Sequence, residues 1–402
     1  MSKVLKIAVY SGEIPSTTFI ERLIVGLSKK DCKVYLFGVL SQRMSYNASV
    51  KLLGYRQNRL FKLLYLLKYN SLLFFTKAAQ KKQFDRFLKS EGRNDLYSKV
   101  KYYPVLYYQP DVFHLQWAKG IGEWAWVEDF GIRLIVSLRG AHINYSPIAD
   151  AELADEYKTY FPKISGFHAV SKAIAKVAVT YGAPADLIKV VYSGLPLADI
   201  QTEIETEREA SGLDNLDIKT LHIISVGRPH WIKGYVHALD ACKQLKRLGI
   251  PFTYTIVGGN SDIELLYQIN DLELNGEVTL TEHQSYQAVQ MLIENADVLL
   301  LPSHKEGVAN VVLEAMAMGT LVLSTDCGGM NEVVVDGENG FLTPIRDFKH
   351  MAERLQHISK LSTEEKTKLK RNAIQTITAQ HTEPLMISKM MALYADVVAN
   401  NL

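Results

Sequence analysis

The sequence has few cysteines, little net charge and no long apolar run, and these shortages exclude several classes of protein. Its three cysteines are odd in number and scattered, which argues against a disulfide framework and a cysteine-based zinc site; they are Cys32, Cys242 and Cys327. The formal net charge is only +2, and no stretch is long and uncharged enough to predict a transmembrane helix. The first ten residues lead into a strand without the layout of a signal peptide. We therefore expect a cytoplasmic protein in which each cysteine is a small buried residue.

The length and composition favour two domains of the α/β class. A chain of 402 residues exceeds what one hydrophobic core normally holds, and its 48% of apolar residues is enough to fill two cores. Apolar runs alternate with helical patterns, which predicts parallel sheets covered by helices. The predicted strands are 6–10, 33–38, 112–115, 134–138 and 166–169 in the first half, and 221–226, 252–257, 278–280, 298–301 and 321–324 in the second half.

Two glutamates follow the predicted strand 298–301, with seven residues between them. Glu306 is expected in the loop at the carboxyl end of this strand, and Glu314 on the helix after it. A carboxylate can accept two hydrogen bonds from the vicinal diol of a ribose. The pair is therefore interpreted as part of a ligand site; the alternative is an ordinary surface loop and a core helix.

The residues between the two glutamates predict a helix N-terminus that can bind an anion. Gly307 breaks the backbone, and Asn310 is expected to cap a helix that ends at Gly319. The amides of residues 307–311 then carry the positive end of the helix dipole. Such amides suit phosphate or sugar oxygens, so we expect an anionic ligand with hydroxyl groups.

A second cluster follows the predicted strand 221–226. Arg228 and Lys233 lie in a glycine-containing turn that leads into a predicted helix at 235–248. The guanidinium is a planar fork for phosphate oxygens, and the ammonium is a mobile point charge that steadies a departing anion. The pair predicts a diphosphate site; the alternative is two solvated cations in a turn.

These residues resemble the retaining, nucleotide-sugar-dependent glycosyltransferases of group 1, also called family 4, whose signature is two glutamates separated by seven residues. The resemblance rests on the following segments: Leu301-Pro302-Ser303, Glu306-Gly307-Val308, Glu314-Ala315-Met316-Ala317, Gly328-Gly329-Met330-Asn331-Glu332 and Asp336-Gly337-Glu338-Asn339-Gly340-Phe341. It implies the GT-B fold, with two facing Rossmann-like parallel-sheet domains and a cleft between them. The expected domains are 1–195 on the acceptor side and 196–380 for the donor, with residues 201–219 as a loop, and a last helix in 381–402 that crosses back onto the first domain.

The resemblance also implies roles for individual residues. Glu306, Arg228 and Lys233 are expected to be catalytic, with the last two on the donor diphosphate. The residues expected to bind the donor are Glu314, Gly307, Val308, Ala309 and Asn310. No metal is expected, because the cations and helix amides supply the positive charge and the chain has no Asp-x-Asp or histidine-rich cluster.

The first domain resembles the variant found in exopolysaccharide and lipopolysaccharide glycosyltransferases. Gly12, after the first strand, is expected to let the backbone approach the donor phosphate. Where many relatives carry a histidine that contacts the donor sugar, this chain has Arg139, which is therefore expected to be catalytic as well. His142 is either a site residue or a solvated loop histidine. His114 either orients an acceptor hydroxyl or is a buried residue hydrogen-bonded to the backbone.

Residues 51–103 carry most of the positive charge. This segment has 13 Lys and Arg against 3 Asp and Glu, which is +10, whereas the rest of the chain carries −8. Leucines and phenylalanines interleave with the bases, a pattern typical of peripheral helices on anionic lipid, with Lys62, Lys68, Lys77, Lys81 and Lys82 as the expected contacts. The alternative is a helix with an apolar side packed on the first domain and solvated lysines. Nucleic acid is not expected, because no motif for it is present.

The function predicted from the sequence is transfer of a sugar from a nucleotide diphosphate sugar to a glycan or lipid-linked acceptor, in cell-surface polysaccharide biosynthesis. The resemblance implies retention of the anomeric configuration. Two alternatives stay open: an epimerase or phosphorylase on the same fold, and a non-catalytic donor-binding protein. The protein is expected in the cytoplasm or at the inner face of the plasma membrane.

Overall fold

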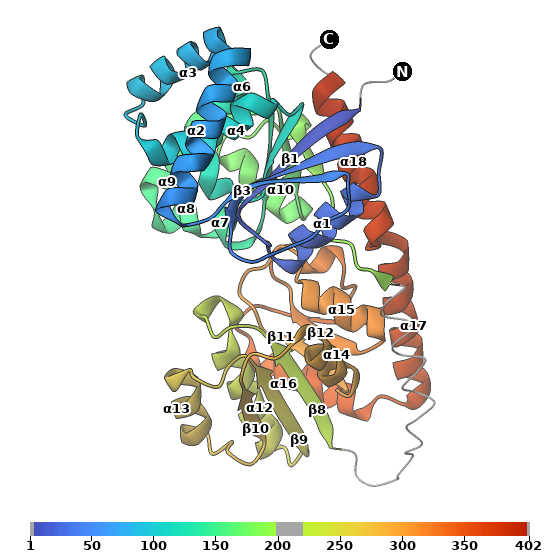
Figure 1. Ribbon diagram of the computed structural model, residues 1–402. Coiled ribbons are helices and arrows are strands. Elements are labelled where there is room, and N and C mark those ends of the chain that lie inside the picture. Colours follow the sequence, from blue (N-terminus) through green and yellow to red (C-terminus); the bar gives the residue numbers. More distant parts are fainter. Residues whose placement is uncertain (1–3, 198–219, 400–402) are drawn as a thin grey trace. The chain divides into compact units, whose positions relative to one another are not determined.

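The computed structural model describes residues 4–197 and 220–399, which form two compact units (Figure 1). The first unit comprises residues up to 169, residues 175–191 and residues from 387 onward; the second comprises residues 170–174 and 192–386. The boundaries at 191 and 386 differ from the expected 195 and 380. Leu195 lies in the second unit, where its amide donates to the His381 carbonyl at 2.8 Å and its carbonyl accepts from the Glu383 amide at 3.0 Å. The stretch 201–219, predicted as a loop, lies outside the described residues.

The first unit is built on a seven-stranded parallel sheet with the order β3-β2-β1-β4-β5-β6-β7. The strands are β1 (Leu5–Ile14), β2 (Cys32–Leu40), β3 (Val50–Tyr55), β4 (Val112–Leu115), β5 (Arg133–Leu138), β6 (Gly166–Ala169) and β7 (Ile188–Val190). Strand order reverses between β1 and β4, and in open α/β sheets ligands bind beyond the carboxyl ends of the strands at such a point. Every side chain of β4 is buried, as expected for a central strand covered on both faces.

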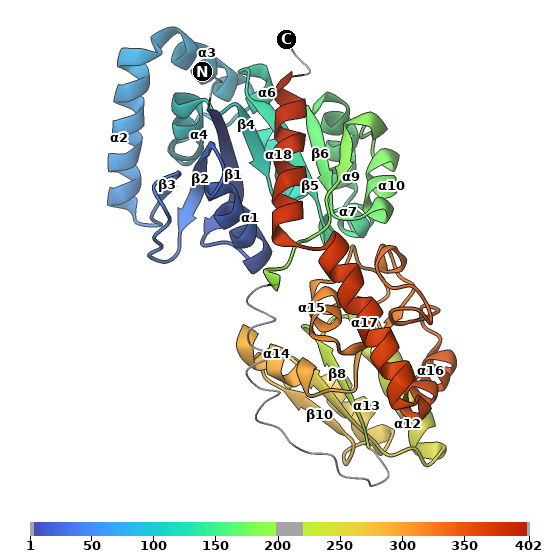
Figure 2. The same ribbon diagram turned by 90° about the vertical axis from the view of Figure 1, so that its right-hand side faces the viewer.

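Helices cover the first sheet and connect its strands. They are α1 (Thr18–Ser28), α2 (Arg59–Thr76), α3 (Ala78–Ser90), α4 (Leu96–Tyr108), α5 (Ile121–Trp124), α6 (Trp126–Asp129), α7 (Gly140–Asn144), α8 (Ser146–Ala149), α9 (Ala151–Tyr160) and α10 (Lys172–Thr180). The long helix α18 (Glu383–Ala399) returns from the far end of the chain, and Figure 2 shows it in front of β4, β5 and β6. Gly166 of β6 allows this approach, because a Cβ there would lie 2.7 Å from the side chain of Val397.

The second unit has a six-stranded parallel sheet with the order β10-β9-β8-β11-β12-β13. Its strands are β8 (Leu221–Val226), β9 (Phe252–Val257), β10 (Val278–Thr281), β11 (Val298–Leu301), β12 (Leu321–Thr325) and β13 (Phe341–Thr343). Its helices are α12 (Tyr235–Arg247), α13 (Ile263–Asp271), α14 (Tyr286–Glu294), α15 (Asn310–Met318), α16 (Phe348–Lys360) and α17 (Thr363–Gln380). Two apolar clusters form its core, one with α12 and α16 and the other with α15 and α17.

The reversal of strand order in the second sheet lies between β8 and β11. The loop with Arg228 and Lys233 follows β8, and the loop with Glu306 follows β11. Because both strands are parallel neighbours, these loops leave the same edge of the sheet side by side. The topology therefore explains why segments about 70 residues apart in sequence meet.

The predicted α/β fold with two Rossmann-like parallel sheets is confirmed, and all ten predicted strands are present. Three strands were missed. Strands β7 and β13 have only three residues each, which is too short for a recognisable pattern. Strand β3 was read as part of the basic segment 51–103, which instead contains most of β3 followed by α2, α3 and most of α4.

Candidate functional site

The loop after β8 is fixed by one close approach of two backbones in the second unit. Gly234 has φ +67°, and a Cβ on it would lie 2.1 Å from the carbonyl oxygen of Pro302. Next to this contact the His304 amide donates to the Ile232 carbonyl at 2.7 Å. Only glycine combines this φ with this space. The two loops are therefore joined through their backbones, and Lys233 is held directly before the contact.

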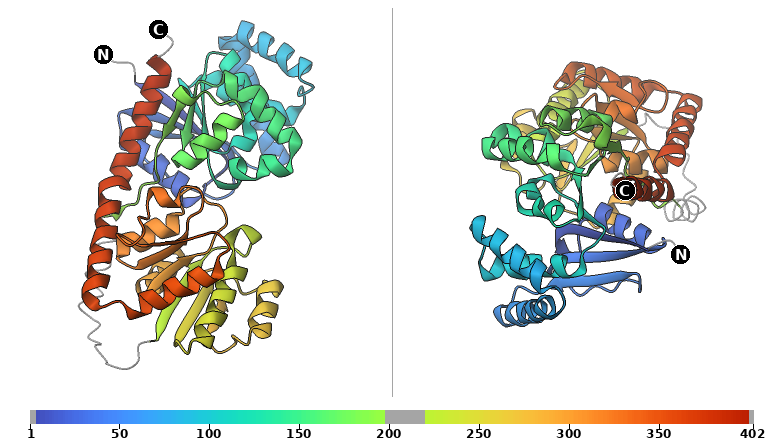
Figure 3. Two further views of the ribbon diagram at one scale, coloured as in Figure 1. Left: turned by 180° about the vertical axis from the view of Figure 1, so that it is seen from behind. Right: turned by 90° about the horizontal axis from the view of Figure 1, so that it is seen from above.

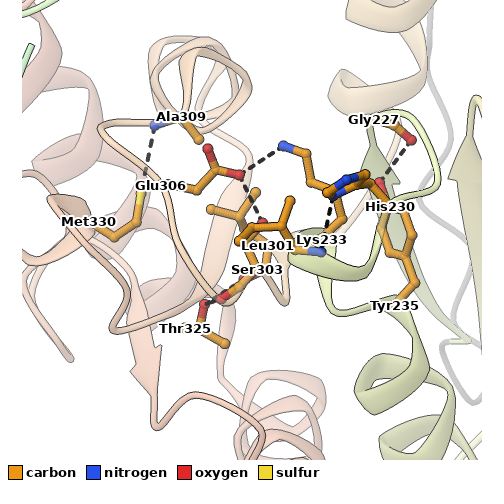
Figure 4. Close-up of polar contacts among 11 residues, drawn as sticks. Gly227, His230, Lys233, Tyr235, Leu301, Ser303, Glu306, Ala309, Thr325 and Met330 are labelled. Atoms are coloured by element: carbon orange, nitrogen blue, oxygen red, sulfur yellow. Dashed lines mark hydrogen bonds and ion pairs between the residues drawn. The ribbon is translucent and has the colours of Figure 1, made fainter. Parts of the chain in front are cut away.

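Lys233 and Glu306 form an ion pair across these loops (Figure 4). The Lys233 Nζ lies 2.8 Å from the Glu306 Oε1, and the Ser303 hydroxyl donates to the same oxygen at 2.9 Å. Both side chains keep some exposure, 26% for Lys233 and 16% for Glu306. The second carboxylate oxygen of Glu306 accepts no hydrogen bond from the described residues. The pair thus presents an ammonium and a free carboxylate oxygen at one edge of the sheet.

The backbone around Glu306 is packed against two glycines. Gly328 has φ +60°, and a Cβ on it would lie 1.9 Å from the Glu306 carbonyl oxygen. The Gly329 amide donates to the Gly307 carbonyl at 2.8 Å. The Gly-Gly pair that follows β12 therefore packs directly against the backbone of the glutamate loop.

The amino end of α15 offers unpaired backbone donors. Within the described part of the chain, no hydrogen bond involves the amides of four residues: Gly307, Val308, Asn310 and Val311. The Ala309 amide points at the sulfur of Met330 at 3.5 Å. The prediction that Asn310 caps this helix is wrong: Ala309 is the capping residue, without a side-chain hydrogen bond, and Asn310 is the first helical residue. No side chain occupies these donors, so they are available for an anion.

The remaining predicted residues of the second unit lie where the sequence placed them. Glu314 is in the second turn of α15 and is buried, and Gly319 ends the helix with φ +72°. Arg228 is exposed on the loop after β8. The structure thus gathers Lys233, Glu306 and the α15 amides around one edge of the sheet, with Arg228 on the same loop as Lys233.

A separate polar cluster lies at the carboxyl edge of the first unit's sheet. The Arg139 guanidinium stacks over the Phe19 ring, with 4.6 Å to its centroid, and its Nη2 donates to the Gln116 Oε1 at 3.4 Å. His142 packs against Trp117, with ring centroids 5.1 Å apart. Burial lowers the pKa of Arg139 to about 10, so the guanidinium is still charged at neutral pH.

This cluster contains buried polar atoms that have no partner among the described residues. They are the Gln116 Nε2, the Arg139 Nε and the His142 Nδ1. Native proteins pair nearly all such atoms, so three together indicate a place for a polar ligand or water. Gly12 lies at the same edge, with φ +94° at a register shift in β1, and nothing lies within 4 Å of where its Cβ would be. An approaching ligand can therefore reach this backbone.

Of the two alternatives for His114, the structure has the buried, hydrogen-bonded residue. Its Nδ1 lies 2.8 Å from the Tyr394 hydroxyl and its Nε2 2.8 Å from the Ser137 hydroxyl. Ser137 continues to the His168 Nδ1 at 2.9 Å, and the His168 Nε2 donates to the Val191 carbonyl at 2.9 Å. Both partners of His114 are side chains, whereas the sequence predicted a hydrogen bond to the backbone. With no exposed surface and both nitrogens engaged, His114 ties α18 to β4 and β5.

The two buried histidines should make the first unit sensitive to acid. Burial, and then the nearby charges of His168 and Arg139, hold the pKa of His114 well below its usual range, and burial lowers the pKa of His168 to about 3. Both are neutral when folded, whereas in the unfolded chain they take up protons below about pH 6.5. Stability is therefore fully present above that pH and falls as the pH drops toward 3, by up to about 1.4 kcal/mol per pH unit for each histidine.

Urea unfolding between pH 7 and pH 5 tests this expectation. In a Trp231→Phe background the remaining tryptophans all lie in the first unit, so fluorescence follows that unit. The double variant His114→Asn/His168→Asn should show a shallower decrease in the free energy of unfolding with falling pH. The exposed His283→Gln serves as the control and should keep the original slope. Equal slopes for the double variant and the parent would contradict the assignment.

Two features of the second unit are not predicted from the sequence. His304 is half-buried, its two ring nitrogens are buried without a partner among the described residues, and burial, then Arg346 and His237, lower the pKa of its imidazole. It lines a cavity of about 160 Å³ together with Trp231 and Tyr235. Its position two residues before Glu306 was the signal that could have identified it.

Glu332 is the second feature, which the sequence shows only as part of a motif. Its carboxylate accepts hydrogen bonds from the amides of Lys172 and Ala173 at 2.8 and 2.9 Å and so holds the start of α10.

Comparison with known proteins identifies the segment that carries this site. Residues 205–376 match the family model described as "Glycosyl transferases group 1", and this range includes both glutamates, Arg228 and Lys233. This segment is a group 1 glycosyltransferase domain. The glycosyltransferase domain contains the whole β8 to β13 sheet, so the sheet edge described above belongs to it.

The chain is also similar to relatives that are named for bacterial polysaccharide synthesis. WcaL of Escherichia coli K12, named for colanic acid biosynthesis, is 32% identical over 180 residues, covering 43% of this chain and 44% of WcaL. The amylovoran biosynthesis glycosyltransferase AmsK of Erwinia amylovora is 29% identical over 242 residues, covering 57% of each chain. The chain thus matches about half of the length of these curated relatives.

Solved structures match over nearly the whole chain and show the fold. The glycosyltransferase of Rickettsia africae has a TM-score of 0.67 at 16% identity, covering 99% of this chain and 100% of its own. HepE of Anabaena, solved in complex with UDP, has a TM-score of 0.67 at 18% identity, covering 98% of this chain and 100% of its own. The two Rossmann-like sheets, one of them within the glycosyltransferase domain, are those of the GT-B fold.

Proposed function

We propose that this protein is a glycosyltransferase that moves a sugar from a nucleotide diphosphate sugar to a glycan or lipid-linked acceptor. The reaction belongs to the synthesis of a cell-surface polysaccharide, at the cytoplasmic side of the plasma membrane. The names of WcaL and AmsK support the process, and the UDP in the HepE structure supports the class of donor. A relative from Campylobacter jejuni, 28% identical over 200 residues, is named for transfer to a diphospho-undecaprenol acceptor, which supports a lipid-linked acceptor here.

The observation that carries the proposal is the pairing of Lys233 with Glu306 beside the unpaired amides of α15. The distance between the Lys233 Nζ and the Glu306 Oε1 is 2.8 Å, and four amides of the adjoining turn have no acceptor among the described residues. The Lys233 ammonium and these N–H groups belong to adjoining loops, and Glu306 is the acidic side chain that the described contacts place against the ammonium. A diphosphate has the charge and the oxygen atoms to bind both the ammonium and the amides.

The mechanism follows from where charge develops. When the bond between the sugar and the diphosphate breaks, negative charge grows on the leaving phosphate. Lys233, Arg228 and the α15 amides supply the positive charge that stabilises it, and preorganised donors of this kind need little reorganisation in the transition state. Glu306 orients Lys233 through Oε1 and leaves Oε2 for a hydroxyl of the donor. Glu314 accepts hydrogen bonds from the ribose diol.

The proposed stereochemical outcome is retention. A phosphate oxygen of the leaving group takes the proton of the acceptor hydroxyl, on the face of the sugar from which the phosphate departs. NMR of the product formed from an α-linked donor tests this directly: an α-linked product supports retention, and a β-linked product contradicts it.

We propose that transfer needs no metal, because cations of the protein face the leaving group. The described residues contain no group of three or more His, Cys, Asp or Glu side chains that is arranged to bind one. Turnover in excess EDTA should equal turnover with added Mg²⁺ or Mn²⁺, and loss of activity in EDTA that either ion restores would contradict the proposal.

The reaction is tested with purified protein and a panel of nucleotide sugars. Membrane glycolipid extract is supplied as acceptor, and mass spectrometry follows the mass added to it. A sugar increment on a lipid or glycan, with release of nucleoside diphosphate, supports transfer. Isomerisation of the donor without acceptor would indicate an epimerase. Release of a sugar phosphate that depends on added phosphate would indicate a phosphorylase. Donor binding without turnover would indicate a non-catalytic protein.

The two glutamates should affect different kinetic constants. Glu314→Gln removes charge from the proposed ribose acceptor, so we expect a raised KM for the donor and weaker binding of the free nucleotide. Glu306→Gln weakens the contact that orients Lys233, so we expect a larger decrease in kcat than in nucleotide affinity. Calorimetry with the nucleoside diphosphate and steady-state kinetics separate these effects. Loss of nucleotide binding in Glu306→Gln alone would reverse the two roles.

A further inference from the structure

Helix α2 exposes an apolar face in its first half and again at its carboxyl end. Seven of its large apolar side chains are exposed by between 48% and 82%; they are Leu60, Phe61, Leu63, Leu64, Leu67, Phe74 and Phe75. The opposite face is the packed one, with Leu66, Tyr69 and Leu73 buried. Figures 2 and 3 show α2 at the margin of the first unit, beside β3. Scattered exposed leucines are common, but seven large exposed apolar side chains on one side of a single helix mark a surface that binds something.

The charges around this face are of one sign. From Lys51 to Phe84 the chain contains eight Lys and Arg and no Asp or Glu. Arg59 and Lys68 are exposed on α2 itself, and Arg56 stacks on Phe61, with 5.5 Å between its Cζ and the ring centroid. A second copy of this face would bring like charges together, whereas an anionic surface is complementary to them.

A cavity adjoins the first turn of α2. It has a volume of about 730 Å³ and lies beyond the carboxyl ends of β2 and β3, with Arg43, Arg56, Gln57 and Asn58 among its lining residues. Asn58 also caps α2 through its side chain, which accepts from the Leu60 amide at 2.9 Å. Two guanidiniums beside an apolar face match the two parts of an anionic lipid, a phosphate head group and a hydrocarbon chain.

We propose that α2 lies in the surface of an anionic membrane, with its leucine face among the lipid chains and the cavity of Arg43 and Arg56 at the level of the lipid phosphates. No helix in residues 4–197 and 220–399 is long and apolar enough to cross a membrane, so this contact is interfacial. The membrane contact extends the proposed function, because it names the surface through which the enzyme meets a lipid-linked acceptor. Only the presence of that acceptor rests on the proposed function.

The contact differs from the one expected from the lysines of segment 51–103. The Lys77 ammonium is taken up by the carbonyls of Leu106 and Tyr107, at 3.3 and 3.0 Å, and Lys81 pairs with Asp85 at 2.6 Å. These lysines are occupied within the unit. Insertion of apolar side chains therefore provides most of the binding, and the remaining bases provide the preference for anionic lipid.

Vesicle sedimentation with the full chain tests the proposal. The probes are phosphatidylcholine vesicles, alone or with about one third phosphatidylglycerol. The variant Leu64→Glu/Leu67→Glu places two carboxylates in the centre of the face and should weaken binding about 100-fold or more. The matched control Ile263→Glu/Tyr267→Glu alters two side chains of α13 in the second unit that are 79% and 71% exposed, and should bind as the parent does.

Salt and arginine variants separate the two parts of the contact. Arg43→Gln/Arg56→Gln should reduce the preference for anionic over neutral vesicles about 10-fold, with little change on neutral vesicles. High salt should weaken binding to anionic vesicles without abolishing it, because apolar insertion is not screened. Binding that disappears in 1 M salt, a level that shortens the screening length to about 3 Å, would overturn insertion.

Other outcomes also overturn the proposal. These are an absence of sedimentation on anionic vesicles at low salt, and unchanged sedimentation of Leu64→Glu/Leu67→Glu. A dimer in analytical ultracentrifugation without lipid, made monomeric by the same variant, would assign the face to a second copy. Vesicle binding requires no donor, so a protein that binds vesicles but transfers no sugar contradicts only the proposed function, and one that transfers sugar but ignores vesicles contradicts only the membrane contact.

Discussion

Lys233→Ala is expected to lower kcat by about two to three orders of magnitude, the usual consequence of removing one preorganised donor from a developing anion. The decrease in kcat should be larger than that caused by replacing an exposed surface lysine, because the Lys233 ammonium is held 2.8 Å from Glu306 on a loop fixed by Gly234. Arg228→Ala should have an effect on the same scale. Steady-state kinetics at saturating donor, with product measured by chromatography, gives the values.

The control for this prediction is Lys243→Ala in the same unit. Lys243 also forms an ion pair, with Glu273 at 2.9 Å, but it lies on α12 away from the loops after β8 and β11. It should keep the parental kcat. Near-parental rates for both Lys233→Ala and Arg228→Ala at saturating donor would mean that the leaving group is stabilised elsewhere.

Gly328→Ala should disable the site by displacing the glutamate loop. Its φ of +60° already disfavours alanine, and the new Cβ would lie 1.9 Å from the Glu306 carbonyl oxygen, so the backbone must move. We expect a stability cost of about 3 kcal/mol or more. We also expect at least a 100-fold lower kcat, because displacement of a reacting group by about 1 Å has an effect of this size.

Gly337→Ala separates the clash from the backbone strain. Gly337 has φ +74°, but nothing lies within 4 Å of where its Cβ would be. The Gly337→Ala substitution should lower the free energy of unfolding by only about 1 to 2 kcal/mol and leave kcat unchanged. Thermal unfolding and kinetics of the two variants together form the test. If Gly328→Ala is no more harmful than Gly337→Ala, the glycine does not position Glu306.

Strands that are apolar at every position were predictable, whereas strands of mixed sequence or of only three residues were not. Strands β4 and β11 are buried at every position and were placed with their correct bounds. Strand β3 carries Lys51 and Gly54 and leads directly into a basic helix, so its sequence does not stand out from that of the helix. Its pairing with β2 supplies the stability that its own residues do not indicate.

The sequence predicts which loops carry the candidate site, but it does not predict the contacts between their side chains. The order of strands and turns placed Arg228, Lys233 and Glu306 at strand ends, because chemistry at this edge follows from the topology. The ion pair between Lys233 and Glu306 depends on the side-by-side position of β8 and β11, which no local pattern encodes. For the same reason the hydrogen-bond partners of His114, one of which is 280 residues away in the sequence, could not be predicted.

The position of α18 has a consequence for how the chain is made. Once the ribosome has synthesised the chain as far as residue 386, every described residue of the second unit has been made. The first unit, whose strands were made earliest, still lacks Tyr394 as a partner for His114 and Val397 as a cover for Gly166. The half of the protein synthesised first is therefore the half completed last. Until then the face of its sheet that α18 covers at β4 and β6 is exposed, and apolar surface exposed during folding favours aggregation.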